Sequence, residues 1–578
     1  MRGPRIAPVL AALTIYLAAC APAAPAPRGA AGGGGEGGAP SGGRGLTLTL
    51  VVRYEVSDLG AKVVAGGPSS ATKREFNAAL SLIDGTGSPQ PYLAASLPQV
   101  NTDSWQVTPD NHMETTYRLK PNLTWHDGSP LTADDFVFAY HVYTAPGIGG
   151  FISKPQDQIE SVEAPDPRTV VIRWRSLYPG AGSLSDGDLD PLPRHILSSA
   201  LDAFLQDPTD QDVLMGSSFW TTDYVGAGPF KLVEWTQGTS IEGSAFDGHA
   251  LGRPKIDRLV VRFIPDENTA MTNLLAGSAD IATDNALRFE HAIELQRQWG
   301  PDNRGGTVLM RPGTRHQILV QFRSDFLKTR ALSDVRVRRA LMHAIDRQAL
   351  NDALFENQGL MAESFVPPGL PYYDDVQRAI TRYPFDPTRT EQLMNEAGYS
   401  KDASGTFVSA SGERFRPTVQ TDSGAQFDRE MSIIQDGWAR IGIDIQPVLL
   451  AAVQVRNNEV RNTFPDLYIT STGVYESALN IFYSGEIGTA ANRWAGNDRN
   501  GWVNPEVDRL WQAFNSTLDR SQRNQDIVSM MKIISDEVPS LPLYFNISPI
   551  GFVASLKGPA AGTTETLEFW NVAEWTKS

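Results

Sequence analysis

Hydrophobic and polar positions alternate with two different periods in the first half of this 578-residue chain. Residues 46–56, LTLTLVVRYEV, alternate and are rich in β-branched side chains, which predicts a strand. Residues 133–143, ADDFVFAYHVY, follow the turn HDGSP and predict a helix. The same reasoning predicts strands at 115–119, 226–235, 256–264 and 279–283 and a short helix at 268–277.

From Asp334 onward the pattern becomes more helical. Residues 334–355 place Val335, Ala340, Leu341, Ala344, Ile345 and Leu350 along one helical face. Further helices are predicted at 386–399, 427–442, 504–516 and 521–537, with strands at 443–450 and 464–471 and an apolar segment at 541–547. Helices and strands alternate throughout, so we expect an α/β body of several lobes.

Length and charge limit the protein classes. A chain of 578 residues is too long for one hydrophobic core, which predicts two or three domains. Its formal net charge is -16 and it holds no long Lys/Arg run, so we expect no nucleic-acid partner.

The first residues predict secretion and lipid anchoring. MRGPR is followed by an apolar stretch too short to span a membrane comfortably, and Leu17-Ala18-Ala19-Cys20 resembles the bacterial lipobox. Residues 1–19 are therefore expected to be a lipoprotein signal peptide, cut before Cys20, the single cysteine, which would carry the lipid. The alternative is an ordinary secretion signal that ends near a cysteine. Residues 20–46 are rich in Ala, Gly and Pro and predict a flexible tether, so we expect an extracytoplasmic protein anchored in the periplasm or at the cell surface.

Residues 124–143, TWHDGSPLTADDFVFAYHVY, hold two histidines and three aspartates and suggest a metal site. Asp134 and His141 lie seven positions apart, too far along a helix to chelate one ion together. Thr132 fits the N-cap, and Asp134 and Asp135 fit the first turn, where the helix dipole favours carboxylates. We interpret the acids as helix-start residues and expect neither a metal nor a cofactor.

Catalysis is not predicted. The chain has no G-x-S-x-G and no H-E-x-x-H, and its eight histidines are scattered. Asp186, Asp188 and Asp190 resemble a calcium loop, but Pro191 and Leu197 occupy positions that need glycine and an acid, so we interpret them as a solvated loop. An extracellular hydrolase remains the alternative from another functional class.

A run of motifs carries a family resemblance. YRLKPNLTWHDGSPLTADDFVFAY resembles the signature of the family 5 solute-binding proteins of ABC importers, the oligopeptide, dipeptide and nickel binders. The likeness continues in order, from about residue 47 to the end, through QPYLAASLPQV, PLPRHIL, VGAGPFKLVEW, KIDRLVVRFIPD, LLAGSADIA, DVRVRRALMHAIDRQAL, FDPTRTEQLMNEAGY, WARIGIDIQ, NPEVDRLW and VPSLPLYF.

The resemblance implies a bilobal α/β fold of the periplasmic-binding-protein type (type II, three-domain class of the oligopeptide-binding proteins). Lobe one would hold residues 47–315, with 86–214 as an inserted subdomain and 542–578 returning to it, and lobe two would hold 316–541. The chain would cross between lobes within 307–320 and 541–546. It would bind a peptide, or alternatively an oligosaccharide, as a monomer, and deliver it to a membrane permease without catalysis.

The resemblance also suggests ligand contacts. Tyr54, Glu55 and Val56 lie in the expected first-strand loop, where the alternative for Glu55 is a solvated acid. Tyr544 and Phe545 lie at the second crossing, where the alternative is a strand in the core.

In the peptide binders a lobe-two strand leads to an aspartate that holds the peptide's α-amine. Here that position falls at Val474-Tyr475, and Glu476 is the nearest acid, so either Glu476 substitutes or the site has no amine to hold. Tyr475 and Glu476 are both predicted ligand contacts. Trp494 lies in an irregular segment and could bind a sugar or an apolar side chain, or pack beneath a loop.

Overall fold

The computed structural model describes residues 45–61, 73–146, 155–283, 285–564, 566 and 568–578. The predicted signal peptide, Cys20 and nearly all of the predicted tether lie outside the described residues. Among the described helices, none is both long and apolar enough to cross a membrane.

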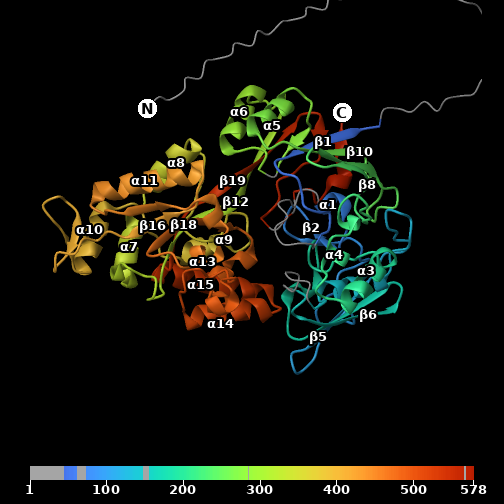
Figure 1. Ribbon diagram of the computed structural model, residues 1–578, viewed down its shortest axis with the longest axis horizontal. Coiled ribbons are helices and arrows are strands. Elements are labelled where there is room, and N and C mark those ends of the chain that lie inside the picture. Colours follow the sequence, from blue (N-terminus) through green and yellow to red (C-terminus); the bar gives the residue numbers. More distant parts are fainter. Residues whose placement is uncertain (1–44, 62–72, 147–154, 284, 565, 567) are drawn as a thin grey trace, which may run out of the picture. The chain divides into compact units, whose positions relative to one another are not determined.

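Two long strands lie in the middle of the main sheet. β12 (Gly306–Val320) pairs antiparallel with β19 (Ser540–Val553), from Gly306 opposite Val553 to Leu319 opposite Ser540 (Figure 1). The register shifts after Pro312, which has no backbone N–H to donate across the pair. The two predicted lobe crossings are therefore neighbouring strands, and their action as a hinge stays a prediction.

Over the described residues the main sheet has eleven strands and mixes parallel with antiparallel pairs. β1 pairs parallel with β10 and β11, whereas β12 pairs antiparallel with β18 and β19. Besides β12 and β19, its strands in sheet order are β17 (Gln446–Leu449), β16 (Thr418–Thr421) and β18 (Leu467–Gly473) on one side, and β11 (Ile281–Ala282), β1 (Thr47–Val52), β10 (Arg258–Phe263), β9 (Ser240–Ala245) and β8 (Phe230–Thr236) on the other, with β13 (Leu360–Met361) paired to β19.

The remaining strands of the described residues form smaller antiparallel sheets. One has four strands, β4 (Trp105–Val107), β5 (Met113–Arg118), β7 (Thr169–Trp174) and β6 (Ile159–Asp166). The paired strands are β2 (Ser81–Ile83) with β3 (Pro89–Pro91), β14 (Tyr399–Lys401) with β15 (Phe407–Ser409), and β20 (Leu556–Lys557) with β21 (Thr576–Lys577).

Among the helices of the described residues, seven follow an N-cap residue whose side chain accepts a hydrogen bond from a backbone N–H of the first turn, and two of these seven have proline at the first position. The helices are α1 (Lys73–Phe76), α2 (Ala133–Tyr143), α3 (Arg194–Gln206), α4 (Asp212–Met215), α5 (Glu267–Leu275), α6 (Phe289–Trp299), α7 (Val335–His343), α8 (Arg347–Phe355), α9 (Tyr373–Ala379), α10 (Pro387–Glu396), α11 (Ala425–Ile441), α12 (Ala452–Val455), α13 (Asn458–Asn462), α14 (Pro505–Ser516) and α15 (Arg520–Glu537).

The continuous helix predicted at 334–355 is wrong. The segment forms two helices, α7 and α8, with a break at residues 344–346. Asp346 causes a second start, because its carboxylate accepts a hydrogen bond of 2.9 Å from the Ala349 backbone N–H. The apolar periodicity continues across the break, so it gives no indication of the N-cap at Asp346.

Separate hydrophobic cores lie within the unit formed by residues 45–578. One core draws on residues 48–281 and also on 550–575, including the fully buried Trp575. A second draws on residues 289–547 and a third on 365–534. The third contains the buried faces of α14 and α15, which pack against each other.

Candidate functional site

The histidine- and aspartate-rich segment has a structural role. Thr132 is the N-cap of α2, and the Asp135 carboxylate accepts from its backbone N–H at 2.8 Å. The other Asp135 oxygen accepts from the Arg194 backbone N–H at 3.2 Å, which ties α2 to α3. His126 is buried and bonded to the Gly228 carbonyl, and burial lowers its pKa to about 4, so it is neutral near pH 7.

Among the side chains that the structure describes, no three His, Cys, Asp or Glu residues are grouped so that they could hold a metal ion. The solvated-loop interpretation of Asp186, Asp188 and Asp190 is wrong, because Asp190 is buried and accepts from the Gly187 N–H at 2.7 Å. Asp188 accepts from the Ser185 N–H at 2.7 Å. These acids shape a partly buried turn.

This turn borders a cavity of about 670 Å³. Two groups of residues, far apart in the sequence, line it, and we call them the first and second walls. The first wall consists of Ile83, Thr86, Gly87, Ser88, Pro89, Tyr178, Pro179, Gly180, Ser183, Ser185, Asp188 and Thr563. The second wall consists of Leu370, Pro371, Glu476, Ser477, Phe514, Asn515, Arg520 and Arg523. The volume is within the range of about 300–1,000 Å³ that small-ligand sites usually have.

The first wall carries hydroxyl groups and one carboxylate. Among the described residues that line it, Asp188 is the one charged side chain. The Tyr178 ring stacks on Trp174 with 5.1 Å between ring centroids, which fixes where its hydroxyl points. Burial, and then the carboxylates of Asp188 and Asp157, raise the pKa of Tyr178, whereas Arg523 lowers it. Tyr178 is therefore a neutral phenol near pH 7, able to donate a hydrogen bond.

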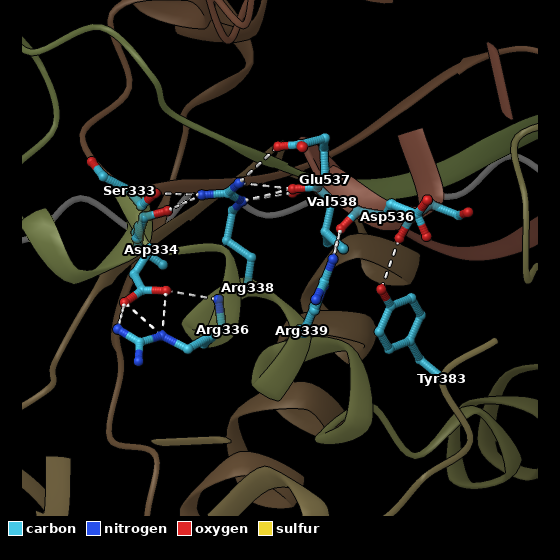
Figure 2. Close-up of polar contacts among 11 residues, drawn as sticks. Ser333, Asp334, Arg336, Arg338, Arg339, Tyr383, Asp536, Glu537 and Val538 are labelled. Carbon is cyan, nitrogen blue, oxygen red and sulfur yellow. Dashed lines mark hydrogen bonds and ion pairs between the residues drawn. The ribbon is translucent and has the colours of Figure 1, made fainter. Parts of the chain in front are cut away.

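The second wall depends on α15, whose first turn presents Arg520 and Arg523 to the cavity. Asp519 caps this helix by accepting from the Gln522 N–H at 2.8 Å. Figure 2 shows how the far end is held: Arg338 and Arg339 of α7 donate to the last carbonyls of α15. Arg338 Nε lies 3.0 Å from the Glu537 oxygen, and Arg339 Nε lies 3.0 Å from the Asp536 oxygen. Both ends of the helix are thus anchored.

Glu476 lies at the start of a 3-10 helix, Glu476–Phe482, after β18. Its two carboxylate oxygens accept from the Arg520 guanidinium at 2.6 and 3.2 Å. Arg523 lies 3.9 Å from the same carboxylate. The second wall therefore carries two cations and one anion.

Glu476 lines this cavity, as predicted for a ligand contact, and its neighbour Tyr475 is half exposed. Whether either residue touches a ligand stays a prediction. Trp494 lies elsewhere, near Phe326 and the Arg323 guanidinium. It is partly buried and is absent from both walls.

The predicted first-strand residues have three different environments. Tyr54 is exposed and lines a separate cavity of about 400 Å³ with Phe355 and Gln426. Glu55 is not a freely solvated loop acid, because it accepts from Trp235 Nε1 and from the Gly238 N–H, both at 2.9 Å. Val56 is buried in the first core.

Tyr544 and Phe545 lie in the core. They are 0% and 2% exposed, and β19 has paired strands along both of its edges at this point. The Tyr544 hydroxyl is 3.0 Å from His316 Nδ1 and 3.2 Å from Gln426 Nε2. Their predicted ligand contact has no support from their position, because each side chain would have to leave a packed core.

Arg520, Arg523 and Asp188 are the charged residues of the cavity that sequence reasoning missed. A signal for the arginines was available, since cations are disfavoured in the first turn of a helix, and two occur there in α15. Nothing local marks Asp188 as a cavity residue, because its wall forms only when the turn packs against distant segments.

The sequence of this chain is similar to the sequences of known proteins. Residues 89–489 match the model of a family described as "Bacterial extracellular solute-binding proteins, family 5 Middle". The oligopeptide-binding protein AppA of Bacillus subtilis (strain 168) is 25% identical over 470 residues, covering 79% of this chain and 80% of that protein.

Solved structures share the fold. NikZ from Campylobacter jejuni, in complex with Ni(L-His), superposes with a TM-score of 0.69 at 22% identity, covering 92% of this chain and 99% of the other. AppA from Bacillus subtilis, in complex with a nonapeptide, gives 0.68 at 20% identity, with coverage of 92% and 99%. These likenesses confirm the predicted α/β, bilobal periplasmic-binding-protein-like fold.

Proposed function

Because the chain belongs to the bacterial extracellular solute-binding proteins of family 5, we propose that it captures a peptide and delivers it to the permease of an ABC importer. The peptide would bind in the cavity between the first and second walls. The protein would bind the peptide without changing it, as a monomer, and no cofactor would take part.

The charges of the cavity carry the peptide proposal. The first wall contributes one carboxylate, Asp188, and the second contributes two arginines with one glutamate. Counted over the described residues, the walls therefore have opposite net charge, which suits a ligand with an ammonium and a carboxylate group. A neutral oligosaccharide would gain little from this charge separation. The relative named as oligopeptide-binding, and the neighbour solved with a nonapeptide, support the same ligand class.

The two-lobe arrangement would make binding a switch. With lobe one at 47–315 and 542–578 and lobe two at 316–541, a peptide that contacts both walls binds the closed form more tightly than the open form. Such a difference in affinity shifts the population toward closure. The crossings at 307–320 and 541–546 would act as the hinge.

A thermal-shift screen of the purified protein tests this function. We expect peptides in the range of di- to hexapeptides to raise the melting temperature, because a ligand of the native state stabilises it. If only oligosaccharides raise the melting temperature, the proposed ligand is a sugar instead of a peptide. Turnover of chromogenic esters or glycosides by the same preparation would contradict a purely binding role and favour the hydrolase.

Lipid anchoring through Cys20 is a second part of the proposal. The lipobox-like Leu17-Ala18-Ala19-Cys20 and the tether at 20–46 support lipid anchoring to a membrane, in the periplasm or at the cell surface. In a Cys20→Ala variant the protein is expected to leave the membrane fraction while the binding body stays folded. Continued partition of this variant with membranes would contradict the anchor.

A further inference from the structure

The second wall contains an incompletely neutralised arginine. Arg520 and Arg523 lie three positions apart on one face of α15, both in its first turn and both bordering the cavity. The first turn of α15 holds no acidic residue. Because a helix N-terminus repels cations, stabilisation of α15 does not explain this pair.

The Glu476 carboxylate already accepts hydrogen bonds from Arg520. Two parallel hydrogen bonds, at 2.6 and 3.2 Å, join its carboxylate to the Arg520 guanidinium, the fork geometry in which arginine holds carboxylates best. A ligand ammonium that approached Glu476 would have to compete with this fork. It would also become a third cation beside Arg520 and Arg523.

Arg523 has hydrogen-bond donors that its contacts with the described residues do not use. Its Nε donates to the Phe514 carbonyl at 2.9 Å, and its guanidinium lies 4.5 Å from the centre of the Phe514 ring. Its two terminal nitrogens donate no hydrogen bond to any residue that the structure describes, and the Glu476 carboxylate is 3.9 Å away. The side chain is 16% exposed, so these nitrogens are largely removed from bulk water.

The electrostatic surroundings agree with this geometry. Burial, and then the charge of Arg520, lower the pKa of Arg523, and Glu476 only partly offsets them. Arginine stays protonated near pH 7 in any case. An anion placed beside Arg523 would relieve both effects and use the open donors.

We propose that Arg523, flanked by Arg520, holds a carboxylate of the bound peptide, and that Glu476 is the counter-ion of the two arginines instead of the group that holds the peptide's amine. The inference rests on the proposed peptide-binding function and adds which end of the ligand the second wall recognises. The carboxylate could be the peptide's C-terminus or an acidic side chain.

Matched peptide pairs test this on the unaltered protein by isothermal titration calorimetry. We expect a free-acid peptide of neutral side chains to bind at least about tenfold more tightly than its C-terminal amide, which lacks only the terminal charge. If the side chain is the source, amidation has little effect and replacing Glu by Gln within the peptide causes the loss. Either pattern supports the carboxylate site and identifies its source.

Variants assign the effect to the residue. In Arg523→Gln the preference between the two members of the sensitive pair is expected to fall below about threefold. Arg509→Gln is the matched control, because Arg509 is exposed on α14, pairs with Glu506 and borders neither wall. It is expected to keep the full preference. Circular dichroism and thermal unfolding check that both variants fold.

Three results would overturn the inference. Equal affinity for charged and neutral members of every pair would do so even if Arg523→Gln fails to fold, because it is read from the unaltered protein. A requirement for the peptide's free amine that disappears in Glu476→Gln would assign Glu476 the opposite role. Failure of all peptides to bind would overturn the proposed function and the inference together, whereas the first two results leave peptide binding intact.

Discussion

Replacing Arg338 is expected to destabilise the part of the chain that contains α15. Its guanidinium is buried and donates to four backbone carbonyls at 2.8–3.1 Å, those of Leu332, Ser333, Glu537 and Val538. Figure 2 shows the arginine between the start of α7 and the end of α15. In Arg338→Met the aliphatic packing is largely retained, but these carbonyls lose their donor.

The magnitude follows from two opposing effects. Each buried carbonyl left without a donor costs about 1–3 kcal/mol. Removing a buried cation recovers part of this, since burial already lowers the pKa of Arg338 to about 10. We expect a net loss of about 3–5 kcal/mol in the free energy of unfolding, the usual cost of breaking a buried charged contact.

Urea unfolding, followed by tryptophan fluorescence at pH 7, measures this loss. Arg336→Met is the matched control, because Arg336 lies on the same helix, is exposed, and pairs with Asp334 at 2.6 Å. A surface pair of this kind contributes at most about 1 kcal/mol. Equal unfolding midpoints and slopes for the two variants would refute the reasoning that Arg338 holds α7 to α15.

Two further predictions concern buried positions. Burial raises the pKa of Asp498 to about 8, against about 3.9 in an unfolded chain, so the native state keeps a proton that unfolding releases. Its stabilising effect is complete below about pH 4 and is lost as the pH rises through about 8. Asp498→Asn should remove this dependence in unfolding curves between pH 5 and 8, and an unchanged slope would contradict it. A methyl group on Gly228 would lie 2.4 Å from the Asn77 backbone nitrogen, so Gly228→Ala should lower the free energy of unfolding by about 2 kcal/mol or more. Gly437 lies in α11 with open space around its Cβ position, so Gly437→Ala should raise the free energy of unfolding by about 0.5–1 kcal/mol. Thermal unfolding measures both changes.

Local signals predicted the elements well. The turn, cap and apolar spacing around residues 126–143 predict α2 with the bounds that the structure has, since Asp135 caps through contacts within a few residues. The break between α7 and α8 escaped prediction because the apolar face continues across it while a single carboxylate, Asp346, restarts the helix. Periodicity reports burial and says little about caps.

The cavity was much harder to predict, because its walls come from distant segments. Glu476 was found through the family resemblance, but its partner Arg520 lies 44 positions further along the chain. Tyr544 and Phe545 were expected to contact a ligand at a predicted chain crossing, but β12 and β13 pair with both edges of β19 at these residues and bury them. Sequence patterns do not predict which edges of a strand are paired. A residue's neighbours in the sheet decide whether it faces a ligand.

A crystal structure of the protein with a bound short peptide tests the central claim most directly. The peptide is predicted to lie between the first and second walls, with a carboxylate within hydrogen-bond distance of Arg523. A peptide bound in the separate cavity that Tyr54 borders, with the space beside Arg523 left to solvent, would contradict both the site and its charge.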